Sequence, residues 1–232
     1  MVKGDLILPS GVSSLDRILN GGLSTGHLTH VFGSASAGKT TLALQFVAGA
    51  CRLGIRVAYI NSETTSPLER LSQITEKEFT ELEDTVRILS PKTFEEQGAV
   101  INDLELYARE ETQLIVVDTL TRLYRTVLED KTANYAAHRE LNMQAGILKG
   151  LARQKDMAVL VLNQVRGSLE ETKGFVPVAH NILDYWADYA IRMTRGTRKG
   201  ERHLERLLPE DGFSQTVFIT ERGFSLTEKP QE

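Results

Sequence analysis

The residues with the clearest chemical potential form one short run near the start of the chain. Residues 33–40 read Gly-Ser-Ala-Ser-Ala-Gly-Lys-Thr and fit the pattern G-x-x-x-x-G-K-[S/T] in full. Small residues let the backbone wrap closely around phosphate groups, and successive N–H groups at a helix N-terminus then face the negative charge. The run therefore predicts a phosphate-binding loop (the P-loop, residues 33–40) between a strand and a helix.

Individual residues of the P-loop have distinct expected roles toward ATP. Lys39 is expected to reach the β- and γ-phosphates, and the Thr40 hydroxyl to bind Mg²⁺. Thr41, directly after the loop, is expected to contact the α-phosphate. The predicted nucleotide contacts here are Ser36, Ala37, Gly38, Lys39, Thr40 and Thr41.

Polar residues end three further apolar runs. Asp118 follows Leu114–Val117 and can hold Mg²⁺ through a water molecule. Glu63 follows another run and can polarise the water that attacks the γ-phosphate, although a solvated loop glutamate is the simpler alternative. Asn163 and Gln164 end the third run, where an amide can report the γ-phosphate or form an Asx-type turn. Lys39, Glu63 and Gln164 are thus the candidate catalytic residues.

These residues need a scaffold that gathers strand ends. Apolar runs alternate with helical patterns, which predicts an α/β fold with a mostly parallel sheet covered by helices. Two runs, Leu114–Val117 and Val159–Leu162, are continuously apolar, as expected of strands buried on both faces. The predicted strands are Leu28–Phe32, Arg56–Ile60, Val86–Leu89, Leu114–Asp118, Ala158–Asn163 and Tyr189–Met193. The predicted helices are Lys39–Leu53, Pro67–Ile74, Phe94–Glu111 and Asn134–Lys155.

The C-terminal part has a different pattern. Its apolar runs are short and are broken by Pro209, Gly212 and Gly223, which predicts an antiparallel extension of the sheet. The predicted strands there are Leu204–Leu208, Thr216–Thr220 and Phe224–Leu226. No linker rich in Pro, Gly or Ser interrupts the chain, so we expect a single domain over residues 1–232.

Length and composition limit the class of protein. The 232 residues, 41% hydrophobic and 25% charged, suit one globular α/β domain. Cys51 is the only cysteine, which excludes an internal disulfide and favours a reduced, cytoplasmic setting. The start has no signal-peptide pattern, and no apolar segment approaches the roughly 20 residues needed to cross a membrane. We therefore expect a soluble cytoplasmic protein.

Charge is unevenly distributed along the chain. The net charge is −4, but residues 63–111 hold 13 acidic and 5 basic residues, whereas residues 192–206 hold 6 basic and 2 acidic ones. Local charge decides whether a phosphate backbone can dock, so the basic segment is a candidate DNA surface without sequence specificity. A solvated charged loop is the alternative. The candidate DNA contacts are Arg195, Arg198, Lys199 and Arg202, with Arg166, Lys173 and Phe175 in a second loop.

Taken in order, these segments resemble the RecA/RadA recombinase family, most closely its short archaeal RadB branch, from about Ser10 to Leu226. Thr25-Gly26 resembles the lead-in to the phosphate-binding strand, and Ser62–Thr65 resembles the segment with the catalytic glutamate. The resemblance extends to Asp118–Thr121 and Asn163–Val165. It implies a RecA-type ATPase core that uses ATP and Mg²⁺, with Arg70 stacking on the adenine.

Departures from the recombinase pattern point to an accessory role. We expect no Phe-x-x-Ala polymerisation motif anywhere in the chain and no N-terminal helical DNA-binding domain. Residues 122–144 lack the glycine-and-arginine pattern of the family's first DNA loop, and the second loop, residues 166–178, is short. The resemblance to RadB implies a weak ATPase that binds single-stranded or branched DNA. It also implies a RadA-type recombinase or a junction-processing nuclease as partner, and a homodimer stays open.

Two other functions fit the same core. An active, filament-forming recombinase is one alternative, and a KaiC-like regulatory ATPase that acts on protein is the other. The basic segment favours DNA over protein as the target.

Overall fold

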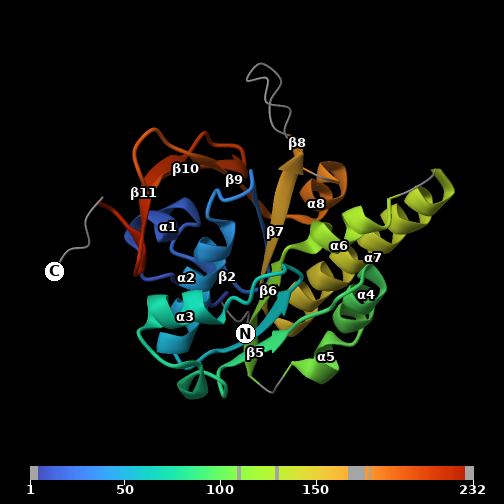
Figure 1. Cartoon of the computed structure of the whole chain (residues 1–232), viewed down its shortest axis with the longest axis horizontal. Coiled ribbons are helices and arrows are strands. Elements are labelled where there is room, and N and C mark those ends of the chain that lie inside the picture. The colour runs from blue at the N-terminus through green and yellow to red at the C-terminus, as the bar shows by residue number, and fades with distance from the viewer. Residues whose placement is uncertain (1–4, 109–110, 129–130, 167–175, 178, 228–232) are drawn as a thin grey trace.

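The computed structural model describes residues 5–108, 111–128, 131–166, 176–177 and 179–227, and a long central sheet dominates it (Figure 1). The strand order is β12-β11-β10-β9-β3-β7-β6-β4-β5. The parallel strands are β3 (Leu28–Gly33), β4 (Arg56–Asn61), β5 (Val86–Leu89), β6 (Thr112–Asp118), β7 (Ala158–Arg166) and β9 (Tyr189–Arg195). The antiparallel strands are β10 (Glu201–Leu208), β11 (Ser214–Thr220) and β12 (Gly223–Ser225). The predicted parallel sheet with an antiparallel C-terminal extension is confirmed.

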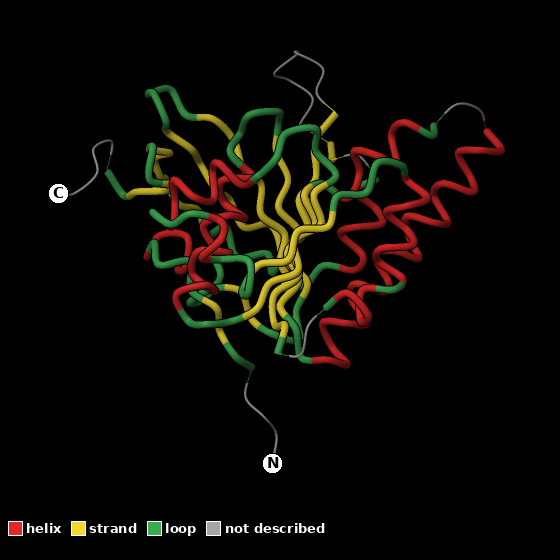
Figure 2. The backbone as a smooth tube through the Cα atoms, turned by 60° about the horizontal axis from the view of Figure 1, so that its bottom comes forward, coloured by secondary structure: helices red, strands yellow, loops and turns green. Residues whose placement is uncertain are grey.

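Helices cover both faces of this sheet, as Figure 2 shows with the strands seen between two helical layers. One layer holds α1 (Ser13–Ile18), α2 (Lys39–Arg52) and α3 (Leu68–Thr75). The other holds α4 (Phe94–Asn102), α5 (Leu104–Tyr107), α6 (Leu120–Thr126), α7 (Lys131–Lys155) and α8 (His180–Trp186). The remaining elements are β1 (Ile7–Leu8) paired with β2 (Leu23–Ser24), β8 (Val176–Pro177) paired with β7, and a 3₁₀ turn, η1 (Phe79–Glu81).

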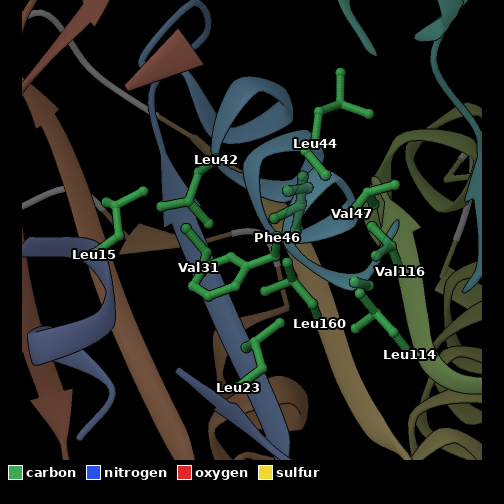
Figure 3. Close-up of a cluster of buried hydrophobic side chains, with 14 of the residues drawn as sticks. Leu15, Leu23, Val31, Leu42, Leu44, Phe46, Val47, Leu114, Val116 and Leu160 are labelled. Carbon is green, nitrogen blue, oxygen red and sulfur yellow. The ribbon is translucent and has the colours of Figure 1, made fainter. Parts of the chain in front are cut away.

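The sheet separates two hydrophobic cores, and alternate residues of each buried strand enter opposite ones. Leu114 and Val116 of β6 lie in the core that includes Phe46 of α2 (Figure 3). Ile115 and Val117 lie in the core on the other face. Side chains of a strand alternate between faces, so a strand buried on both must be apolar throughout. This explains the continuous apolar runs seen in the sequence.

Several predicted boundaries were wrong. The predicted helix Phe94–Glu111 is broken, because α4 ends at Asn102 and the short α5 starts at Leu104. Asp103 occupies the break, and its Oδ1 accepts a hydrogen bond from Asn102 Nδ2 at 3.1 Å. Asn and Asp are weak helix formers because their side chains can compete with the helical backbone for hydrogen bonds. Helices α1, α6 and α8 were not predicted; each spans only six or seven residues, too few for a helical period to stand out.

The structure also bears on two expectations from the sequence, one about a polymerisation motif and one about membrane-spanning helices. The expectation that the chain lacks Phe-x-x-Ala was wrong, because residues Phe32–Ala35 match it by letter. Phe32 is only 3% exposed within β3, however, so this run is not available as a polymerisation motif. Among the described residues, no helix has the length and apolar character required to span a bilayer.

Candidate functional site

The P-loop joins the end of β3 to the start of α2 and turns tightly over the edge of the sheet. Ser36 and Gly38 have φ of +58° and +102°, in the left-handed region where glycine is favoured. A Cβ atom on Gly38 would come within 2.3 Å of Ile219 Cδ1, the end of a side chain that can shift, so the positive φ is the main reason for glycine here. Its geometry is therefore that of a backbone cradle at a helix N-terminus, as the sequence predicts.

Lys39 is buried and directed back over the P-loop. Its Nζ donates to the carbonyl oxygens of Gly33 at 3.0 Å and Ser34 at 2.9 Å. Burial lowers the pKa of Lys39, and the negative charges of Asp118 and Glu63 oppose that shift. The ammonium group thus lies at the floor of the loop, where phosphate oxygens are the acceptors expected to complete its hydrogen bonds.

Asp118 ends the buried strand β6 and is 1% exposed. Tyr59 Oη donates to its Oδ2 at 2.7 Å, whereas Oδ1 is buried and has no hydrogen-bond partner among the described residues. Burial raises the pKa of Asp118, and the nearby Tyr59 and Thr40 hydroxyl groups oppose this shift. A buried carboxylate oxygen without a donor, next to the Thr40 hydroxyl, fits the hydration shell of Mg²⁺.

Glu63 lies beyond the end of β4, beside Asp118. Adjacent parallel strands bring them together, because Asn61 of β4 is in register with Asp118 of β6. Glu63 Oε1 accepts from Thr119 Oγ1 at 3.1 Å, and Oε2 is 3.7 Å from Arg122 Nε. Arg122 also donates from Nη1 to the Ser62 carbonyl at 2.6 Å. The carboxylate is therefore held in place from two sides.

Gln164 reaches the same edge of the sheet from β7, in register with Gly33 of β3. Its Oε1 accepts from Arg125 Nη1 at 3.2 Å. Arg122 and Arg125 were both missed from the sequence. They lie three residues apart on α6, directly after Asp118, so each contacts a candidate catalytic side chain. A helix predicted immediately after Asp118 would have revealed them.

One cavity of about 480 Å³ gathers almost every predicted nucleotide residue. Ala37 is the exception among the P-loop contacts, because its side chain is fully buried. Arg202 and Ile219, from the antiparallel half of the sheet, complete the wall. The lining residues are Ala35, Ser36, Gly38, Lys39, Thr40, Thr41, Glu63, Thr65, Asp118, Thr119, Gln164, Arg202 and Ile219.

Arg70, expected to stack on adenine, does not line this cavity. Its guanidinium group donates to the carbonyl oxygens of Thr220 at 2.7 Å and Glu221 at 2.6 Å, and to Gln73 Oε1 at 2.8 Å. Burial lowers its pKa. In this conformation Arg70 holds the turn between β11 and β12 next to Ile219, and adenine stacking stays a prediction.

The basic segment 192–206 is a hairpin with a shorter turn than the predicted strands Tyr189–Met193 and Leu204–Leu208 implied. β9 and β10 extend through it, and only residues 196–200 form the turn. Arg192 pairs with Glu205, and the buried Arg206 pairs with Asp211. Pairing within the fold therefore neutralises part of the local charge that the sequence shows.

The predicted DNA contacts divide into two groups. Arg195 and Arg202 are turned toward the P-loop, where they donate to the carbonyls of Ala35 at 2.9 Å and Ala37 at 2.7 Å. The hairpin tip, defined as Arg198 and Lys199, is exposed. Arg166 ends β7; its side chain, together with Lys173 and Phe175, lies outside the described part of the chain.

Comparison with known proteins gives a consistent result. A family model described as Rad51 matches residues 3–220. The DNA repair and recombination protein RadB of Thermococcus kodakarensis is 36% identical over 228 residues, covering 94% of this chain and 98% of that protein. The protein of the same name from Thermococcus onnurineus is 35% identical over 224 residues, covering 94% and 96%. A crystal structure of the RadB recombinase matches with a TM-score of 0.79 and 32% identity, covering 94% of this chain and 99% of that one. This match confirms the predicted RecA-type fold.

Proposed function

The chain belongs to the Rad51 family, and on that premise we propose that it binds ATP with Mg²⁺, hydrolyses it slowly, and serves as a DNA-binding accessory protein in recombination and repair. It would act as a single RecA-like domain. The observation that carries the proposal is the cavity in which the P-loop meets Glu63, Asp118 and Gln164. Proteins of the RecA and Rad51 type are ATPases, and this cavity holds the groups that such chemistry needs.

Each group has a defined task in the proposed reaction. The P-loop amides and Lys39 bind the phosphates, and Thr40 with Asp118 would hold Mg²⁺, which neutralises charge between the β- and γ-phosphates when bound. Glu63 orients the attacking water and accepts its proton. Gln164, which is hydrogen-bonded to Arg125 of α6, contacts the γ-phosphate. Through this contact, the presence of the γ-phosphate affects the end of β7.

Slow hydrolysis follows from the surroundings of Glu63. Both carboxylate oxygens already have partners, Thr119 on one side and the Arg122 cation on the other. A general base must present a lone pair to water, and the contacts with Thr119 and Arg122 compete with water for the Glu63 carboxylate. These contacts support the proposed low turnover.

DNA binding is supported by the exposed hairpin tip and by the names of the relatives. Two exposed cations make a small electrostatic footprint, in keeping with modest, salt-sensitive affinity for single-stranded or branched DNA. Phe32, the only phenylalanine that fits Phe-x-x-Ala, is buried, which favours an accessory role over a filament of this chain alone. A RadA-type recombinase or a junction-processing nuclease is the proposed partner, and a cytoplasmic location and a homodimer also stay predictions.

The test is a titration of single-stranded and branched DNA with and without ATP at two salt concentrations, together with an ATPase assay. We expect salt-sensitive DNA binding and slow, Mg²⁺-dependent hydrolysis. Absence of nucleotide binding would remove the proposal. Because the matched crystal structure is described as a recombinase, a filament-forming recombinase is the second candidate. Continuous filaments on DNA in electron micrographs would favour it.

A further inference from the structure

The carbonyl groups of the P-loop are unusually well supplied with cationic donors. All five carbonyl oxygens of residues 33–37 accept a hydrogen bond from Lys39, Arg195 or Arg202. Lys39 serves the first two of these carbonyls and Arg195 the third. Arg202 serves the last two, with Nη2 3.4 Å from the Ser36 oxygen and Nε 2.7 Å from the Ala37 oxygen.

By holding the carbonyl groups, these donors also fix the direction in which the N–H groups of the P-loop point. The C=O and N–H bonds of one peptide unit point in opposite directions, so a donor that fixes the carbonyl also fixes the amide on the other side. Successive amides held in this way form a concave anion site before any anion arrives. Arg195 and Arg202 therefore organise the P-loop, although neither belongs to the sequence motif.

The two arginines are also direct cross-strand neighbours, since Arg195 of β9 pairs in register with Arg202 of β10. Like charges directly opposite each other in a sheet are destabilising. Burial and the charge of Arg195 both lower the pKa of Arg202. A polyphosphate close to this pair would relieve the repulsion.

The two arginines line different cavities next to the P-loop. Arg202 lines the cavity that contains Lys39 and Asp118. Arg195 lines a second cavity of about 390 Å³, which shares Gly33, Ser34 and Ala35 with the loop. Both guanidinium groups thus contact the loop, and of the two only Arg202 lines the nucleotide cavity.

We propose that Arg202 is a phosphate-binding residue for the nucleoside triphosphate and that Arg195 positions it and the P-loop from behind. This inference rests on the proposed ATP binding and assigns both arginines to the nucleotide instead of to DNA. The hairpin tip that carries Arg198 and Lys199 is a separate part of the same hairpin, because the turn begins one residue after Arg195.

The test measures nucleotide affinity by titration calorimetry on the full chain, with ATP, ADP and inorganic triphosphate as probes. A hydrogen bond to a charged group contributes about 1.5–3 kcal/mol, so Arg202→Ala should weaken ATP binding by roughly 10- to 100-fold. Arg202→Lys should restore part of this loss, because it keeps the charge but not the fork that bonds the loop. Arg195→Ala should have a smaller effect.

Controls separate this role from a purely structural one. Arg153, exposed on α7 and 3.8 Å from Asp188, provides a matched arginine, and Arg153→Ala should bind ATP like the parent. The salt dependence of ATP affinity should become shallower in Arg202→Ala, which general loosening of the fold would not cause. If Arg202→Ala binds ATP normally while Lys39→Ala does not, this inference is wrong and the proposed function stands. If both variants bind ATP normally, the proposed function itself fails.

Discussion

The two halves of the sheet supply the nucleotide cavity in different ways. In the parallel half, β3, β4, β6 and β7 run toward the same edge, and a residue within two positions of each strand end lines the cavity. In the antiparallel half, Arg195 and Arg202 reach the P-loop because β9 pairs with β3 and β10 pairs with β9. In the parallel half, a residue reaches the cavity because of its position along its own strand. In the antiparallel half, a residue reaches the cavity because its strand pairs with a strand next to β3.

The same difference governs charge. In the parallel half, the buried Asp118 and the half-buried Glu63 both line the cavity. The arginines of the antiparallel half look alike in sequence but have four different environments: an ion pair with Glu205, a buried pair with Asp211, the P-loop carbonyls, and an exposed position 4.0 Å from Glu201. A dense basic segment therefore does not by itself provide an equally dense basic surface.

The largest effect is expected in the parallel half. Lys39→Ala removes the cation at the floor of the P-loop, so tight ATP binding and all hydrolysis should be lost. Calorimetry and a phosphate-release assay would measure both. The tip variant Arg198→Ala should leave ATP affinity unchanged, since Arg198 does not line the cavity. Equal ATP affinity in the Lys39 variant and the parent would show that the parallel half does not bind the phosphates through Lys39.

Glu63→Gln should separate chemistry from binding within the same half. The amide keeps the shape and the contact with Thr119 but cannot take a proton, so hydrolysis should fall by about 10²-fold or more with ATP affinity little changed. Single-turnover assays compare the two rates. A variant that hydrolyses ATP as fast as the parent would show that Glu63 is not the catalytic group.

Arg206→Ala tests whether the basic segment contains structural cations. Arg206 is 6% exposed and donates to the Ile18 carbonyl at 2.9 Å as well as pairing with Asp211. Its loss should lower the free energy of unfolding by about 2–3 kcal/mol, the contribution of hydrogen bonds to a charged group. Arg198→Ala, at an exposed position, should stay within about 0.5 kcal/mol. Denaturant unfolding would reveal whether the two arginines differ as expected.

The smallest effect is expected at the hairpin tip. Replacing Arg198 and Lys199 by Ala removes two exposed cations, so the slope of log affinity for single-stranded DNA against log salt should fall by about 1.4. ATP binding should be unaffected. Fluorescence anisotropy at several salt concentrations gives the slope. An unchanged slope would move the DNA surface to another part of the chain, with the segment of Arg166 and Lys173 as the next candidate.

The sequence by itself determined the parallel half. The P-loop motif is local, because its backbone geometry depends on small residues and a left-handed Gly38 within the motif. Continuous apolar runs fixed the buried strands, and parallel strands must end at one edge, so Glu63, Asp118 and Gln164 could be placed together. The placement of Arg195 and Arg202 depends on their contacts with the P-loop, and no local sequence pattern predicts these contacts.

Tertiary structure also decided the partners of the catalytic groups. Helix α6 is too short to show a period in the sequence, so Arg122 and Arg125 became visible only beside Glu63 and Gln164. Local patterns encode backbone conformation and burial, whereas the partner of a long cationic side chain depends on segments distant in the chain. Arg202 and the Ala37 carbonyl that it contacts are 165 residues apart. That separation is the physical reason why composition suggested a DNA surface where the fold directs Arg202 to the P-loop.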